Sequence, residues 1–307
     1  MNVLDKLRVL QWHIGLIRRP IAELLDDYCD RDIEWLRITP EPQTAADPFG
    51  LIRNGHLHIF FEYRPHGKLD AFIAHVQVEP DGRISQAQPV LKLSYHLSYP
   101  FLFEFGGDLY MVPESGEGGE VMLFRCTEFP VRWEKAAVIL PGVRSADNTI
   151  VQHDGWWWLF AACGEGWTEL HLWWATSPSG PWYPHPRNPV KTDPGSSRPA
   201  GTLFTRNGEF FRPAMDNTEV YGRRVVVNRV TALSPEEFSE EPVTYLEPDS
   251  RSFCPKARHT LAAVGDDVTL TDGARRAFTL KPQRLLGKLR AHSAARRRAA
   301  SRRVGGR

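Results

Sequence analysis

The sequence predicts an all-β fold, a five-bladed β-propeller, for residues 39–280 of this 307-residue chain. Three observations favour it. Gly and Pro each occur 24 times, which is typical of a chain with many turns. Few segments have the apolar periodicity of long helices. Glycines that precede short apolar strands recur about every 50 residues, and a repeat of this length is typical of propeller blades.

The segment before the propeller, residues 1–38, has a different pattern. Between Asn2 and Asp27 apolar residues recur at roughly helical spacing, and Pro20 interrupts them. This pattern predicts one or two short helices. Residues 33–38 have the composition of a strand. We expect this leading segment to pack against the propeller or to close its ring.

Five turn glycines mark the repeat, and each precedes aromatic or branched residues. They are Gly55, Gly107, Gly155, Gly208 and Gly265, at intervals of 52, 48, 53 and 57 residues. The dipeptides Asn-Gly, Gly-Gly and Asp-Gly predict hairpins, because hairpin turns need positive φ. Each blade would therefore contain one such hairpin. The alternative is a β-sandwich whose hairpins fall at chance intervals.

Polar residues occupy similar offsets around these turns. Eight residues before a turn glycine stand Asp47, Tyr99 and Asp147, and at nearby offsets stand His96, Arg198 and His259. Glu62 and Glu114 follow a turn glycine by seven residues, and Asp216 follows by eight. In a hairpin, residues at these offsets before and after the turn lie together at the open end. The first strand of each blade lines the central channel of a propeller, so we expect these side chains to meet at one mouth of that channel. Alternatively, the aspartates stabilise turns.

The last 27 residues differ in charge from the rest of the chain. Residues 281–307 contain ten Lys or Arg and no Asp or Glu, which leaves 28 basic and 37 acidic residues elsewhere. We expect a disordered basic tail, which could contact an anionic surface. The acidic remainder and the lack of a nucleic-acid-binding motif argue against a specific nucleic-acid partner.

Other residue types limit the location and the chemistry. The four cysteines lie far apart without a Cys-x-x-Cys motif, which favours free thiols in a reducing compartment. We see no signal peptide or transmembrane segment, so we expect a cytoplasmic protein. His56 and His58 flank Leu57 within a strand and lack typical metal-ligand spacing, so we expect neither a metal nor a cofactor.

Several motifs together resemble a known family. Ala46-Asp47-Pro48-Phe49 resembles the blade-one signature of the five-bladed glycosidase superfamily (glycoside hydrolase families 43 and 32), where an Asp-Pro supplies a catalytic carboxylate. A fuller set, spanning about Trp12 to Leu270, resembles the N-terminal domain of plant glucosamine inositolphosphorylceramide transferases. It comprises Phe60-Phe-Glu62, His96-Leu-Ser-Tyr-Pro-Phe101, Met111-Val-Pro-Glu-Ser115, Ala146-Asp147, His185-Pro-Arg-Asn-Pro-Val190, Ser197-Arg-Pro-Ala-Gly201, Arg212-Pro213, Asp216 and Tyr221-Gly222.

In the plant proteins a separate glycosyltransferase domain follows, so the resemblance implies the propeller and not the transferase activity. A separate glycosyltransferase is therefore a possible partner of the basic tail. The resemblance implies a carbohydrate-active protein that hydrolyses or transfers a sugar at a glycosidic bond of a glycan or glycoconjugate. The alternative is a non-catalytic glycan-binding or accessory propeller in glycoconjugate biosynthesis.

Glycoside cleavage uses two carboxyl groups, one on each side of the scissile bond. The resemblance suggests Asp47 as base or nucleophile and Asp147 as the residue that orients the sugar and adjusts the pKa of the acid. Glu114 is the first choice for general acid, because a strand end beside His96 can be desolvated, and Glu62 and Asp216 are alternatives. The expected substrate contacts are Glu62, His96, Tyr99, Arg198, Arg212, Asp216 and His259.

Overall fold

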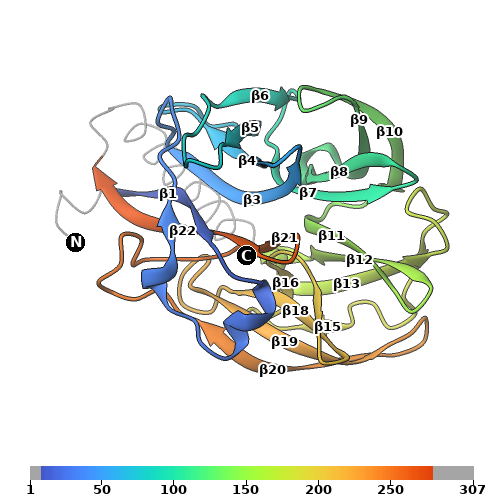
Figure 1. The fold of residues 1–307 in the computed structure, drawn as a ribbon. Coiled ribbons are helices and arrows are strands. Elements are labelled where there is room, and N and C mark those ends of the chain that lie inside the picture. Colours follow the sequence, from blue (N-terminus) through green and yellow to red (C-terminus); the bar gives the residue numbers. More distant parts are fainter. Residues whose placement is uncertain (1–7, 279–307) are drawn as a thin grey trace, which may run out of the picture.

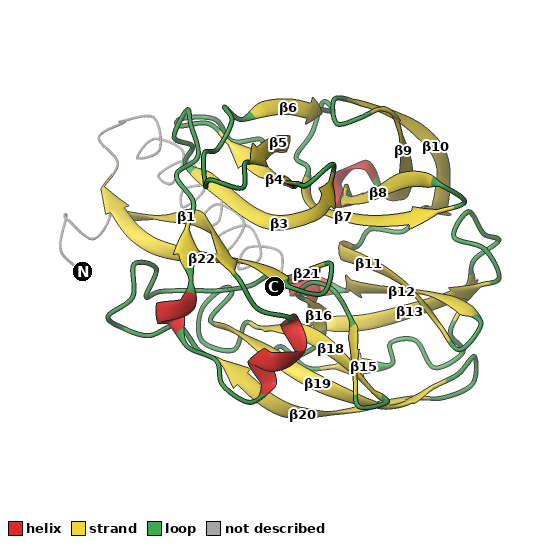
Figure 2. Cartoon of the chain, viewed as in Figure 1, coloured by secondary structure: helices red, strands yellow, loops and turns green. Residues whose placement is uncertain are grey.

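The structure is a computed structural model and describes residues 8–278. Strands make up most of it, as Figure 2 shows. The helical elements of this part are 3-10 turns: η1 (Ile21–Leu25), η2 (Asp30–Asp32), η3 (Gly116–Gly118) and η4 (Glu165–Trp167). Among the described residues no helix is long and apolar enough to cross a membrane. The basic tail lies outside the described residues.

The strands of the described residues form four hydrogen-bonded sheets around the centre of the molecule (Figure 1). The largest sheet divides at one parallel bridge, so we describe the strands as five antiparallel groups. The first group is β3 (Thr44–Arg53), β4 (His56–Arg64), β5 (Phe72–Val78) and β6 (Gln88–Leu91). The second is β7 (Ser98–Phe105), β8 (Asp108–Glu114), β9 (Glu120–Glu128) and β10 (Arg132–Pro141). The third is β11 (Ala146–His153), β12 (Trp156–Cys163), β13 (Glu169–Ala175), β14 (Tyr183–Pro184) and β15 (Lys191–Thr192).

The fourth group is β16 (Arg198–Pro199), β17 (Phe204–Arg206), β18 (Glu209–Asp216), β19 (Arg224–Leu233) and β20 (Phe238–Leu246). The fifth combines strands from both ends of the described chain: β21 (Leu261–Val264), β22 (Val268–Phe278), β1 (Arg8–Ile17) and β2 (Glu34–Trp35). A single parallel bridge, Trp12 to Thr44, joins the fifth group to the first.

The first strands of the groups contact one another in a closed ring. β3 contacts β7, β7 contacts β11, and β11 contacts β16. Gly201, just after β16, bridges to Leu261 at the start of β21, and β21 contacts β3. Sheets that radiate from a ring of first strands are the arrangement of a β-propeller. The fold class predicted from the sequence is therefore confirmed.

Of the one or two short helices predicted between Asn2 and Asp27, the described residues contain only the 3-10 turn η1 after Pro20, and a helix before Pro20 is not seen. Residues 8–17 form β1, which pairs with β22 at every position from Arg8–Phe278 to Ile17–Thr269. Trp12, Ile14 and Leu16 are buried at the two-residue period of a strand. This long-range pairing outweighs the local helical spacing, which is only a weak preference. The segment closes the ring, one of the two roles expected for it.

Each predicted turn joins two neighbouring strands of one group: β3 and β4, β7 and β8, β11 and β12, β17 and β18, and β21 and β22. Gly55, for example, has φ of 77° and follows Asn54, whose φ is 53°. Two successive residues with positive φ are the requirement of a type I′ hairpin turn. The turn glycines at 107, 155, 208 and 265 also have positive φ.

The first strands of three groups share one further backbone feature near their start. Asp47, Tyr99 and Asp147 have φ of 51°, 45° and 53°, and the strand register shifts at each of them. Positive φ is unfavourable for residues other than Gly, although Asp tolerates it better than most. The common offset of eight residues therefore corresponds to one bulged backbone position that is repeated in three groups.

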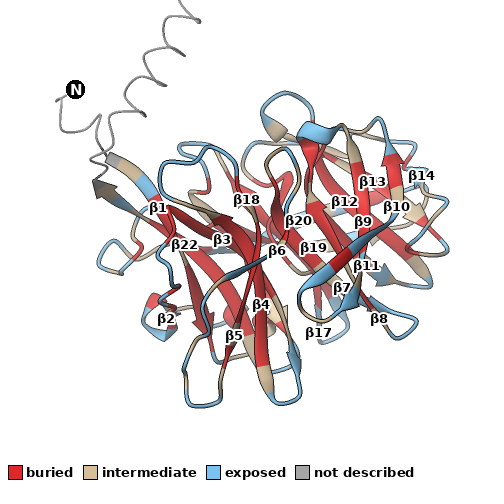
Figure 3. Cartoon of the chain, turned by 90° about the horizontal axis from the view of Figure 1, so that it is seen from above, coloured by how far each residue is buried: buried red, intermediate tan, exposed pale blue. Residues whose placement is uncertain are grey.

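Buried apolar side chains form clusters that neighbouring groups share. Figure 3 shows that long stretches of the strands are buried. Phe60 and Met111, from the first and second groups, share one such cluster. Trp158 and Phe210, from the third and fourth groups, share another. Trp157, Trp158 and Trp173 are buried, so these tryptophans belong to the core rather than to a sugar-stacking surface.

Candidate functional site

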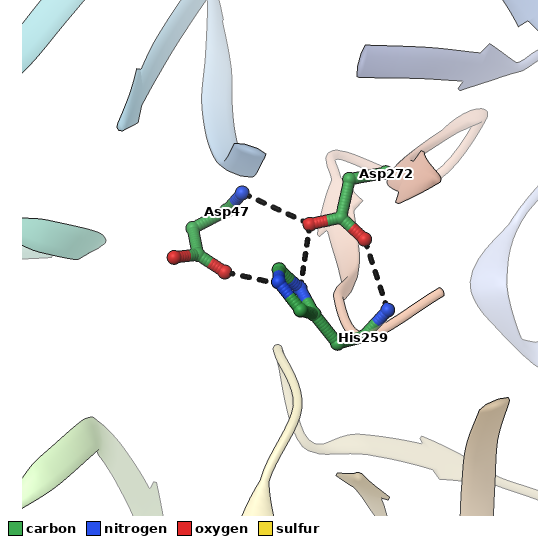
Figure 4. A group of neighbouring side chains, drawn as sticks. All are labelled: Asp47, His259 and Asp272. Atoms are coloured by element: carbon green, nitrogen blue, oxygen red, sulfur yellow. Dashed lines mark hydrogen bonds and ion pairs between the residues drawn. The ribbon is translucent and has the colours of Figure 1, made fainter. Parts of the chain in front are cut away.

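Asp47, on the bulge of β3, is held by residues of the fifth group. Its backbone N–H donates to Asp272 Oδ2 at 3.0 Å, and its Oδ1 accepts from the Thr260 hydroxyl at 2.9 Å. His259 Nδ1 lies 2.7 Å from Asp272 Oδ2 and 3.3 Å from Asp47 Oδ1 (Figure 4). All four side chains are buried. We call Asp47, His259, Thr260 and Asp272 the Asp47 cluster.

The protonation states in the Asp47 cluster follow from burial and mutual charge. Burial disfavours a charged His259, yet the Asp272 and Asp47 carboxylates outweigh it and raise its pKa to about 9. Burial raises the pKa of Asp47 to about 6, against the effect of the His259 charge. Burial also acts to raise the pKa of Asp272, but His259 and the N–H donors outweigh it and lower that pKa. At neutral pH the cluster therefore holds an imidazolium between two carboxylates.

Aromatic rings enclose His259. The ring of Trp12 stacks on it with centroids 3.9 Å apart, and Tyr221 contacts it edge-on at 5.3 Å. Gly222 has φ of 64°, and a Cβ there would lie 3.1 Å from both His259 and Trp12. The glycine of the Tyr221-Gly222 motif thus leaves room for this stack, and Tyr221 is 47% exposed.

Asp147, on the equivalent bulge of β11, has different partners. Arg198 donates to both of its carboxylate oxygens, through Nε to Oδ2 and through Nη2 to Oδ1. The backbone N–H of Asp147 donates to Glu114 Oε2 at 3.3 Å, and Arg198 Nη2 lies 3.5 Å from the same oxygen. We call Asp147, Glu114 and Arg198 the Asp147 cluster.

Glu114 has an unusual protonation equilibrium. Burial, followed by the Asp147 carboxylate, raises its pKa well above the usual value, although Arg198 acts in the opposite direction. The Asp47 carboxylate contributes to the same rise in the pKa. Glu114 therefore favours the protonated form while Asp147, paired with Arg198, accepts hydrogen bonds.

Glu62 and His96 lie beside the two clusters. Glu62 Oε1 is 3.7 Å from His96 Nε2. Burial, followed by the Asp47 charge, raises the pKa of Glu62 to about 8. Burial lowers the pKa of His96, whose Nδ1 accepts a hydrogen bond from the Ala71 N–H at 3.3 Å. A neutral Glu62 thus faces a neutral His96 at pH 7.

Three residues expected to contact substrate have their polar atoms engaged elsewhere. The Tyr99 hydroxyl is fully buried between Thr149 Oγ1 at 2.8 Å and the Gly201 N–H at 2.6 Å. Arg212, also fully buried, binds Glu240 and the carbonyl oxygens of Ser196 and Ser197. Asp216 accepts from Thr218 and from Arg224 Nε at 2.8 Å.

Asp272 is the main site residue that the sequence interpretation omitted. It follows Gly265 by seven residues, the offset at which Glu62 and Glu114 follow their own turn glycines. In both clusters the carboxyl group at this offset accepts the N–H of the bulged aspartate in the next group of the ring: Asp272 from Asp47, and Glu114 from Asp147. Extending the offset to the fifth glycine would have found Asp272.

Within the described range, one set of side chains could hold a metal ion. The ligand atoms of Asp47, His259 and Asp272 all lie within 4.8 Å of one another. However, Asp272 already accepts from the N–H groups of Asp47, His259 and Thr260. His259 Nδ1 also lies 2.7 Å from it. This arrangement is that of an ion-paired network, and the expectation that no metal is needed stays a prediction.

Comparison with known sequences finds similarity over most of the ring. The family model described as "Glucosamine inositolphosphorylceramide transferase 1, N-terminal" matches residues 39–258. The rice protein (Oryza sativa subsp. japonica) named Glucosamine inositolphosphorylceramide transferase 1 is 35% identical over 209 residues, which cover 65% of this chain and 28% of that protein. The Arabidopsis thaliana protein of the same name is 34% identical over 208 residues, 65% of this chain and 27% of its own length. The chain thus spans less than a third of these relatives.

Comparison with solved structures finds the same fold. A family 117 glycoside hydrolase from Zobellia galactanivorans matches with a TM-score of 0.55 and 12% identity, over 92% of this chain and 98% of that one. An arabinanase of Bacillus subtilis matches with a TM-score of 0.52 and 12% identity, over 75% of this chain and 93% of that one. At such low identity these likenesses establish the fold alone.

Proposed function

The chain belongs to the family of glucosamine inositolphosphorylceramide transferase 1 N-terminal domains, and from this premise we propose that it is a carbohydrate-active propeller. In this proposal the five strand groups are its blades, and the two clusters line the mouth where a glycan or glycoconjugate binds. The protein hydrolyses or transfers a sugar at a glycosidic bond. One observation carries the proposal: on two equivalent bulges a buried aspartate donates its N–H to a buried or half-buried carboxyl group of the preceding strand group, Asp47 to Asp272 and Asp147 to Glu114.

The mechanism assigns one role to each carboxyl group. Glu114, which favours the protonated form, donates its proton to the leaving glycosidic oxygen. Asp47, with a pKa of about 6, is ionised at neutral pH and either takes a proton from the attacking water or attacks the anomeric carbon. Asp147, fixed by Arg198, orients a sugar hydroxyl and helps to keep Glu114 protonated.

Glu62 and Asp216 are the alternatives to Glu114 as general acid, and they differ in their pKa. Glu62 remains an alternative, because its pKa of about 8 also keeps it protonated at neutral pH. Asp216 is a weaker choice, since hydrogen bonds from Thr218 and Arg224 outweigh its burial and lower its pKa. A residue that is ionised at neutral pH has no proton to donate.

The substrate class and location are also part of the proposal. The relatives carry the name of a glucosamine inositolphosphorylceramide transferase, which supports a glycoconjugate as substrate. We place the protein in the cytoplasm, with the tail at 281–307 as a contact for a separate glycosyltransferase or an anionic surface. The transferase reaction itself is not extended to this chain, which matches only a part of those proteins.

A second candidate is a glycan-binding propeller without catalysis. The contacts of Glu114 favour it: its Oε2 accepts from the Asp147 N–H at 3.3 Å and lies 3.5 Å from Arg198 Nη2, so this carboxyl group is already part of a hydrogen-bonded network. In this case Glu114 donates a hydrogen bond, not a proton.

The variants Glu114→Gln and Asp47→Asn distinguish the two candidates, once a glycan screen of the purified protein has found a ligand. An enzyme should lose turnover by roughly 10²–10⁴-fold in each variant while it still binds the glycan. Asp108→Asn, a change of a half-exposed carboxylate on β8, is the matched control. If the parent binds without cleavage, or both variants turn over like the parent, the catalytic assignment is wrong.

A further inference from the structure

A cavity of about 490 Å³ lies beside the Asp47 cluster, between β1, β2 and the chain that leads into β3. Trp12 is its shared wall. This residue lines the cavity, and its ring stacks on His259, which is ion-paired to Asp47. β1 and β3 meet here through the Trp12–Thr44 bridge. Trp12 therefore connects the cavity to the Asp47 cluster.

The cavity offers faces on which a sugar ring can pack. Phe253 is 44% exposed, and Trp35 lies beside it with ring centroids 5.8 Å apart. Both residues line the cavity, as does Trp12. Exposed aromatic faces present a large apolar surface with a polar edge. Such a surface suits a ring that has both C–H and O–H groups.

The charged side chains of the cavity are mainly basic. Arg37 and Arg275 line it, together with one carboxylate, Glu41. Glu41 accepts a hydrogen bond from the Gln11 amide at 2.9 Å. Arg275 donates to the Gln11 side-chain oxygen at 3.3 Å, and its guanidinium lies over the Phe253 ring. Neither arginine has an ion-pair partner within residues 8–278. Unpaired guanidinium groups are the usual ligands of phosphate and carboxylate in proteins.

His13 supplies an unused hydrogen-bonding atom at the same cavity. Its Nε2 is buried and has no hydrogen-bond partner among the described residues. Burial, followed by the charge of Arg275, lowers the pKa of His13 to about 4, so the ring is neutral at pH 7. Buried polar atoms in proteins normally have a partner. His13 lines the cavity, so a ligand bound there is a candidate partner for this atom.

From these features we propose that the cavity is a binding subsite for an anionic sugar, a sugar ring that carries a phosphate or a carboxylate. The aromatic faces pack on the ring, Arg37 and Arg275 bind the anionic group, and His13 Nε2 binds a hydroxyl. This inference rests on the proposed function and specifies the substrate: a glycoconjugate with a charged unit next to the bond at the Asp47 cluster.

The test is a calorimetric titration of the full chain with four probes: glucose 1-phosphate, glucuronate, glucose and inorganic phosphate. The parent should bind both charged sugars at least about tenfold more tightly than glucose, since hydrogen bonds to charged groups are the strong ones. The double variant Arg37→Gln/Arg275→Gln should lose about that factor for the charged sugars and leave glucose unchanged. Arg132→Gln, an exposed arginine on β10, is the matched control and should bind like the parent.

Several outcomes would overturn the inference. Glucose that binds as tightly as the charged sugars, or a double variant that binds them like the parent, removes the anionic subsite. If inorganic phosphate binds as tightly as glucose 1-phosphate, the sugar ring contributes nothing to binding, and the cavity is an anion site rather than a sugar subsite. Glu114→Gln separates this inference from the proposed function. A variant that binds charged sugars normally and retains turnover refutes the catalytic assignment, while the subsite stands.

Discussion

The Asp47 and Asp147 clusters share a backbone and differ in chemistry. In each, a bulged aspartate with positive φ donates its N–H to a carboxyl group that follows a turn glycine by seven residues. Asp272 in the first cluster is kept ionised by His259 and backbone N–H groups, whereas Glu114 in the second favours its protonated form. The repeat thus determines where a carboxyl group lies, and its neighbours determine whether it holds a proton.

The largest expected effect is a difference in the free energy of unfolding that is lost when Asp272 or Glu114 is replaced. Asp272→Asn removes a fully buried charge that pairs with His259, and breaking such a pair should lower the free energy of unfolding by about 3–5 kcal/mol. Glu114→Gln replaces an acid that is already neutral, so its cost should be about 1 kcal/mol. Urea unfolding at pH 7 measures both. Equal losses would mean that the two groups have the same charge.

The next effect is the pH dependence of stability. Of the two cations, His259 in the Asp47 cluster titrates between pH 6.5 and 9, and Arg198 in the Asp147 cluster does not. The pKa of His259 is raised from 6.5 to about 9, so its stabilisation is fully present below pH 6.5 and is lost as the pH rises through 9. That loss should be on the order of 3 kcal/mol. The difference in stability between the parent and His259→Gln should therefore shrink from pH 6.5 to above pH 9.

Arg198 provides the control for this pH effect. Burial disfavours its charge, but the paired Asp147 carboxylate acts against burial and the pKa of Arg198 lies well above its usual value, so it stays charged throughout this range. The difference between the parent and Arg198→Gln should therefore stay constant from pH 6.5 to 9. A difference that changes with pH as much as that of His259→Gln would contradict the contrast between the clusters.

The smallest effect tests the feature that the two clusters share, the bulged aspartate with positive φ. Replacing Asp47 by Ala or by Gly removes the same carboxylate, but only Ala is penalised at positive φ. The Ala variant should be less stable than the Gly variant by about 1 kcal/mol. The same difference is expected for Asp147, whose φ is 53°. Urea unfolding of the four variants measures it, and a difference at only one position would show that the bulges are not equivalent.

The sequence predicted the features that depend on local chemistry. Turn glycines such as Gly55 need positive φ wherever they occur, so their spacing revealed the repeat and placed Asp47 and Asp147 at equivalent positions. It did not predict β1, because the partner of this strand, β22, lies at the other end of the described chain. It also could not foresee that Glu240 engages Arg212, since that contact depends on how β18 and β20 lie in three dimensions.

The closure of the ring has a consequence for biosynthesis. Asp47 and its anchor Asp272 are 225 positions apart, and His259 is capped by Trp12 from β1. A nascent chain therefore cannot complete the Asp47 cluster until the residues of β22 have left the ribosome. Such long-range contacts slow folding, since a large loop must close before they form. The Asp47 cluster thus assembles only after β22 is available, and a chain that ends before β22 lacks the Asp272 anchor.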